Sequence, residues 1–66
     1  MESYRGWSIQ PFARPARGGG WEPVATLERA PRKVLVPFNW AVAVTEKDAV
    51  QKATSLARDW IDRGEA

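Results

Sequence analysis

A single amphipathic pattern between Thr45 and Arg63 limits the folds open to this chain more than any other feature. Its apolar side chains recur at spacings of one and three residues, which gathers them on one face of a helix with 3.6 residues per turn. They are Ala49, Val50, Ala53, Leu56, Ala57, Trp60 and Ile61. Thr45 is a typical N-cap, Asp48 follows at the capping-box position, and Gly64 is suited to end the helix. We predict a helix over residues 46–63 whose apolar face must be buried.

Three segments before the helix have the composition of β-strands. Residues 4–13 and 21–29 alternate their side chains between two faces, as a half-buried strand does. Residues 33–44 are also rich in β-formers, but Pro37 cannot donate a ladder hydrogen bond, so we expect a bend there. The Arg-Pro-Ala-Arg-Gly-Gly-Gly stretch of residues 14–20 has the composition of a turn.

These elements predict one small α+β domain over residues 1–66. A three- or four-stranded antiparallel sheet would carry the C-terminal helix on one face, in the order β-β-β-α, with a fourth strand if the chain divides at Pro37. The sequence has no Cys and no His, which excludes disulfides, Cys/His zinc sites and any His-based catalytic triad. It has four Trp. We interpret them mainly as core residues, because each ring can bury roughly 150–250 Å² and a domain of this size has few other large apolar side chains for its core.

No segment resembles a membrane span or a targeting signal. The most apolar stretch, residues 34–44, is shorter than the roughly 20 apolar residues that a spanning helix needs. Residues 1–7 are polar and charged, unlike a signal peptide. The sequence therefore predicts a cytoplasmic protein that does not bind membranes.

Basic residues gather in the predicted sheet and its loops, although the net charge of +2 is no argument for nucleic acid by itself. Arg14 and Arg17 adjoin three Gly, and these residue types can hold a phosphate backbone. Arg32 and Lys33, with Arg29, form a second cluster. A solvated loop is the plainer interpretation of both.

The face of the sheet opposite the helix is the other candidate binding surface. Alternation places on it Tyr4, Ser8, Gln10, Phe12, Val24, Thr26, Ala41 and Ala43. Aromatic rings with polar neighbours and flanking Arg are typical of a single-strand nucleic-acid platform, and equally of a homodimer interface. An ordinary half-exposed face is the plainest interpretation, and the dimer comes before the nucleic-acid platform among the others. The residues of the predicted binding surface are Tyr4, Gln10, Phe12, Arg14, Arg17, Arg32 and Lys33.

No set of catalytic side chains can be assembled from the sequence. Glu22 and Glu28 are six residues apart on one strand, about 20 Å at 3.3 Å per residue, whereas a glycosidase pair needs roughly 5–10 Å. Asp59 and Asp62 fall on the solvated face of the helix. We expect no enzymatic activity, no cofactor, no metal and no small-molecule ligand.

Three short stretches carry a resemblance to known proteins. They are Tyr-Arg-Gly-Trp-Ser-Ile at residues 4–9, Gly-Trp at residues 20–21, and Ala-Arg-Asp-Trp-Ile-Asp at residues 57–62. Together they resemble small uncharacterised bacterial domains of β-β-β-α form. In outline the order is also similar to HicB-like antitoxin domains and double-stranded-RNA-binding domains. However, the Gly-rich signature of the former and the first helix of the latter are missing. The resemblance implies a fold and no activity.

Taken together, the sequence predicts a non-catalytic interaction module. Self-association or binding of a protein partner, through the uncovered sheet face or an edge strand, is the first hypothesis. The alternative is nucleic-acid binding through the arginine-glycine loop and the aromatic residues of the sheet.

Overall fold

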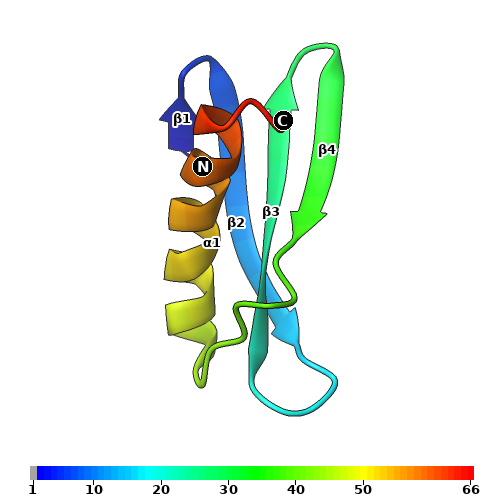
Figure 1. Cartoon of the computed structure of the whole chain (residues 1–66), viewed down its shortest axis with the longest axis vertical. Coiled ribbons are helices and arrows are strands. Elements are labelled where there is room, and N and C mark those ends of the chain that lie inside the picture. The colour runs from blue at the N-terminus through cyan, green and yellow to red at the C-terminus, as the bar shows by residue number, and fades with distance from the viewer. Residues whose placement is uncertain (1) are drawn as a thin grey trace.

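A computed structural model describes residues 2–66, so the first residue of the predicted domain lies outside the described part. The strands are β1 (Glu2–Tyr4), β2 (Trp7–Pro15), β3 (Trp21–Arg29) and β4 (Arg32–Pro37), and they are followed by the helix α1 (Glu46–Asp62). The sheet is antiparallel with the order β1-β2-β3-β4, and α1 packs across β2 and β3 (Figure 1). The predicted α+β class, with its antiparallel sheet and C-terminal helix, is confirmed.

The N-terminal hairpin is the first difference from the predicted strands. Arg5 and Gly6 have φ angles of +49° and +84°, and they turn the chain back after Tyr4. Two successive residues with positive φ are typical of a type I′ turn, whose twist suits a hairpin. The segment predicted as one strand over residues 4–13 is therefore a short β1 paired with the start of β2, with Tyr4 opposite Trp7. The order is β-β-β-β-α.

The second difference lies in the connection, residues 38–45, which joins β4 to α1. The expected bend at Pro37 is present, but residues 40–44 do not form the paired strand predicted there. Only Ala43 makes a bridge, through two hydrogen bonds with Trp21 of 2.8 and 2.9 Å. The chain turns because the Ala41 N–H bonds the Phe38 carbonyl oxygen, and Phe38 goes into the core with 1% of its surface exposed. Burial of this ring outweighs the β-propensity of the valines that follow it.

The core lies between α1 and the sheet. Ala49, Ala53 and Ala57 form a fully buried stripe on the helix, and side chains this short let the helix approach the sheet closely. Because α1 packs mainly over β2 and β3, β4 needs a second cover. Phe38 joins the same core cluster as Val36 of β4, and its ring packs edge-on against Trp60, with 6.2 Å between the ring centroids.

Both ends of α1 are capped as the sequence predicted. Thr45 Oγ1 accepts a hydrogen bond of 3.2 Å from the Asp48 N–H. At the other end Gly64 has φ +73°, and the N–H groups of residues 64 and 65 bond the carbonyl oxygens of Ile61 and Trp60, as in a Schellman motif. Among the described residues, no helix has the length and apolar character needed to cross a bilayer.

The alanine stripe gives a direct test of the close helix approach. We expect Ala53→Leu to lower the free energy of unfolding by about 1–3 kcal/mol, because the larger side chain has no room against the sheet. The matched control is Lys47→Leu on the exposed face of the same helix, where a change within about 0.5 kcal/mol is expected. Urea unfolding of both variants measures the difference. Equal losses would show that the helix does not depend on small residues at this face.

Candidate functional site

The uncovered face of the sheet carries part of the predicted binding surface. Gln10 and Phe12 lie on it, with Phe12 opposite Val24. Leu35 and Pro37 of β4 share this face, opposite Thr26 and Val24. Val24 is fully buried there, while Phe12 and Leu35 keep 36% and 55% of their surface exposed. The face thus carries a strip of partly exposed apolar side chains.

The prediction that Tyr4 lies on the uncovered face is wrong. Tyr4 pairs with Trp7 and therefore points to the helix side, where its hydroxyl donates to both carboxylate oxygens of Asp62 at 3.0 and 2.9 Å. The turn at residues 5–6 is the cause, because it reverses the chain and so changes the face of the residues before it, while Gln10 and Phe12 after it keep the predicted face. Ala41 was also misplaced, since it packs against the core, and Ala43 is buried beside Trp21.

The predicted basic residues are not brought together. Arg14 pairs with Glu22 at 2.7 Å, and Arg17 lies in the β2–β3 loop at one end of a molecule 34 Å long. Arg32 and Lys33 follow the β3–β4 turn at the other end (Figure 1). The Arg32 guanidinium lies 5.9 Å from the centroid of the Trp7 ring, so this side chain covers the core edge there. A ligand would have to span most of the 34 Å length of the molecule to contact both basic clusters.

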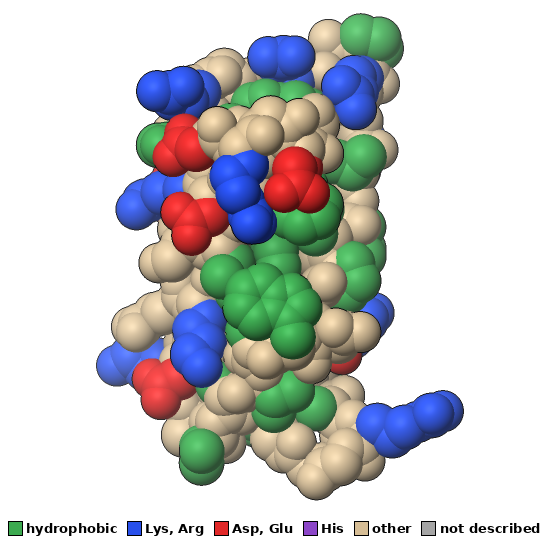
Figure 2. Space-filling view, in the orientation of Figure 1, with side chains coloured by type: hydrophobic (Ala, Val, Ile, Leu, Met, Phe, Trp, Pro, Cys, Tyr) green, Lys and Arg blue, Asp and Glu red, His purple; other side chains and the backbone are tan. Residues whose placement is uncertain are grey.

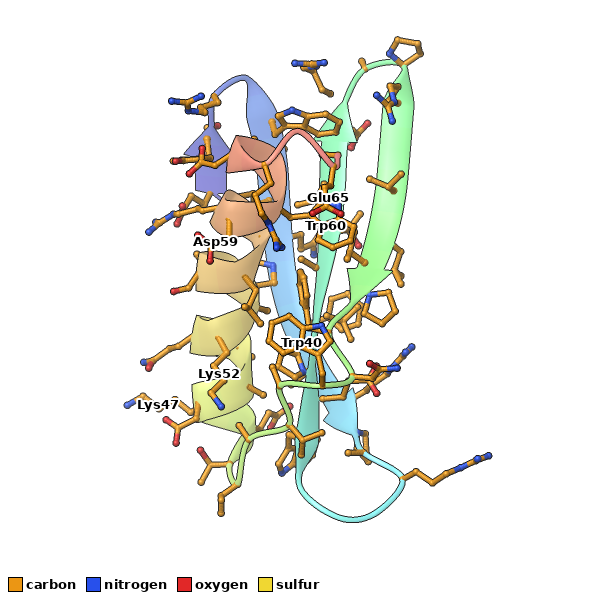
Figure 3. All side chains as sticks on the ribbon, in the orientation of Figure 1. Trp40, Lys47, Lys52, Asp59, Trp60 and Glu65 are labelled. Carbon is orange, nitrogen blue, oxygen red and sulfur yellow. The ribbon has the colours of Figure 1, made fainter. Side chains whose placement is uncertain are left out.

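An open groove lies between the connection and α1, and we name it the Trp40 groove. Its volume is about 740 Å³. One wall is the segment Trp40–Val44 and the other is the helix, with Asp48, Gln51, Lys52, Ser55 and Leu56. Figure 3 shows Trp40 beside α1, with Lys52 reaching out from the helix near it.

The wall formed by the connection is fixed in place. The two hydrogen bonds between Ala43 and Trp21 hold it to the start of β3. Gly20 permits this contact, because a Cβ there would lie 2.7 Å from the Ala43 carbonyl oxygen, and its φ of +79° also favours glycine. Trp40 rests edge-on against the buried Phe38, with 6.3 Å between the ring centroids. The groove is therefore built on the core and does not depend on a mobile loop.

Trp40 itself is mostly exposed, with 67% of its surface accessible to solvent. It forms the apolar patch in the middle of the face shown in Figure 2, between α1 and β4. Val42 and Val44 extend the apolar surface, with 42% and 88% exposed. Asp48 and Lys52 on the helix wall carry opposite charges, so the groove has no net charge.

Sequence reasoning did not find this site, because it assigned Trp40 to a strand and counted it as a packing residue. The signal that could have revealed the exposed Trp40 is its closeness to Phe38 in the sequence. Two large rings two residues apart, next to a bend at Pro37, compete for one place in a small core. The ring that loses this competition is left at the surface.

Four of the eight acidic side chains form ion pairs. Asp62 binds the Arg5 guanidinium at 3.3 Å as well as Tyr4, Glu2 pairs with Arg58, and Glu22 with Arg14. Over residues 2–66, His, Cys, Asp and Glu form no group of three or more that could hold a metal ion. These side chains serve to join the elements, as Glu2–Arg58 joins β1 to α1.

Comparison with known proteins gives no relative: no family model, curated protein or solved structure matches this chain. The resemblance drawn from residues 4–9, 20–21 and 57–62 therefore remains an expectation, and the arguments below rest on geometry.

Tyr4 offers a test of its corrected position, because it is the only Tyr of the chain. The hydrogen bond to the Asp62 carboxylate raises the pKa of Tyr4 above its ordinary value of 10.0. The folded state thus holds the phenol proton more tightly than the unfolded state. This stabilisation is present below pH 10 and is lost as the pH rises through the folded-state pKa. Absorbance titration of the phenolate should show the raised value.

Two substitutions on the helix separate this contact from general charge effects. Asp62→Asn should lower the pKa of Tyr4 toward 10.0, because it removes the charged acceptor. Asp59→Asn removes the same charge three residues away and should leave the Tyr4 titration unchanged. If the pKa of Tyr4 were the same in the wild type and in Asp62→Asn, Tyr4 would not be in contact with Asp62.

Proposed function

We propose that this chain is a non-catalytic protein-interaction module that binds an apolar segment of a partner protein in the Trp40 groove. The observation that carries the proposal is a Trp with 67% of its surface exposed, held on a rigid wall of a groove of about 740 Å³. Trp is among the residues that most often dominate the energy of a protein interface. A cytoplasmic location, expected from the sequence, is part of the same proposal.

The shape of the surface favours a protein over a small molecule. Small ligands are usually enclosed by a concave site. Here Val44 is 88% exposed and Val42 also projects, so covering them requires a partner with a surface of its own. A rim with both Asp48 and Lys52 suits a segment of mixed or neutral character.

The nucleic-acid alternative has less support. Its basic residues lie at opposite ends of the molecule, Arg14 is already paired with Glu22, and Tyr4 is bound to Asp62. The Trp40 groove brings no excess of positive charge to a phosphate backbone.

Selection from a displayed library of random peptides tests the proposal. Peptides selected on the wild-type protein should share an apolar or aromatic anchor. Their affinity should fall at least about 30-fold with Trp40→Ala, which corresponds to the roughly 2 kcal/mol lost at a typical interface hot spot. Titration of a synthetic peptide against both proteins measures this loss.

The matched control is Phe12→Ala, because it removes an exposed aromatic ring from the opposite face of the sheet. Affinity should change less than about twofold, the range of a contact outside the binding site. A library that yields no binder, or binders that lose affinity with Phe12→Ala and keep it with Trp40→Ala, would contradict the proposal. The second result would move the site to the uncovered face.

A further inference from the structure

The edges of the sheet differ in whether their outward backbone N–H groups follow one another along a single strand. The N–H of Phe38 donates to the Pro23 carbonyl oxygen at 2.9 Å, so residues 23 and 38 are a hydrogen-bonded pair. Such pairs alternate along an antiparallel ladder. In the register of β3 and β4, Val34 and Val36 therefore direct their N–H groups to β3, and Lys33 and Leu35 direct theirs outward.

The opposite edge is largely blocked by proline. The hydrogen bond from the Ala16 N–H to the Gly20 carbonyl oxygen sets the same alternation for β2 and β3. Beyond the part of β2 that β1 covers, the outward positions are Pro11, Ala13 and Pro15, and the two prolines have no N–H, so Ala13 offers a single N–H between them. β1 has three residues and offers only the N–H of Ser3. Among the described residues, β4 is therefore the edge strand that offers two successive outward N–H groups, those of Lys33 and Leu35.

We infer that β4 pairs with β4 of a second copy of this chain, antiparallel and centred on Leu35. In this register each Leu35 N–H bonds the Leu35 carbonyl oxygen of the other copy. Each Lys33 N–H bonds the carbonyl oxygen of Pro37, and the Lys33 carbonyl oxygen at this outer end of the pairing is left to solvent because Pro37 has no N–H. The edge therefore complements itself with four hydrogen bonds, and the two sheets join into one.

Side chains and charges agree with this register. Leu35 is 55% exposed, and pairing places it against its counterpart on the uncovered face. On the helix side Val34 lies opposite Val36. Edge strands often carry a charged residue that prevents such pairing, and Lys33 is of this kind. Here, however, Lys33 lies opposite Pro37, so no like charges face each other. A register centred on Lys33 would oppose the two lysines directly and is disfavoured.

The partner is a second copy, because in this register the exposed Leu35 meets its own counterpart and the charged Lys33 meets the uncharged Pro37, so identical edges are complementary in both apolar surface and charge. This surface is separate from the Trp40 groove. A failure of peptide binding there leaves the pairing untouched, and the reverse also holds.

Sedimentation equilibrium of the wild-type protein tests the inference. An interface of one strand pair is below the standard size, so we expect a monomer at about 10 μM and a dimer by about 1 mM. Leu35→Pro removes the central outward N–H without breaking the ladder to β3, since Pro37 already occupies an equivalent position. This variant should stay monomeric throughout. Leu35→Ala keeps the N–H and should still dimerise, at a higher concentration.

Amide hydrogen exchange decides the same question without a substitution. At the higher wild-type concentration the N–H groups of Lys33 and Leu35 should gain at least about tenfold protection, while Ser3 on the opposite edge should not. A wild-type protein that is monomeric at about 1 mM would overturn the inference. The inference would also be overturned if Leu35→Pro dimerised with the same affinity as the wild type. Equal gains in exchange protection at Ser3 and at Lys33 and Leu35 would overturn it as well.

Discussion

The burial of Phe38 is the interaction on which the rest of this structure depends. One helix of 17 residues cannot cover a sheet of four strands, and α1 packs over β2 and β3. Phe38 belongs to the same core cluster as Val36 of β4, and its ring contacts Trp60 of the helix. Its N–H still bonds Pro23 of β3, and the chain turns directly after it, where the Ala41 N–H bonds the Phe38 carbonyl oxygen. The connection, and with it the Trp40 groove, follow from this one ring.

Local signals explain which parts of the fold could be predicted from the sequence. The apolar period of the helix, its Thr45 cap and its Gly64 terminator all lie within one segment. The helix could therefore be predicted without knowing its contacts with the rest of the chain. The position of Tyr4 depended on whether Arg5 and Gly6 formed a turn, because a turn there reverses the chain and changes the face of every residue before it. The alternation pattern alone could not decide this.

The candidate site was harder to predict, because it arises from competition between residues. Phe38 and Trp40 are both suited to a core, and only the three-dimensional fit of the helix on the sheet decides which is buried. The basic residues illustrate a related difficulty. Arg14 and Arg32 are both basic, but the length of the strands between them places them at opposite ends of a molecule 34 Å long. Spacing along the chain gave no measure of that distance.

The most direct measurement of this account compares the free energies of unfolding of Phe38→Ala and Trp40→Ala. If Phe38 is the core residue and Trp40 the surface residue, Phe38→Ala should lose about 3–5 kcal/mol or fail to fold, as truncation of a buried ring does. Trp40→Ala should lose less than about 1 kcal/mol. Equal losses, or a larger loss for Trp40→Ala, would mean that Trp40 belongs to the core and is not a binding residue.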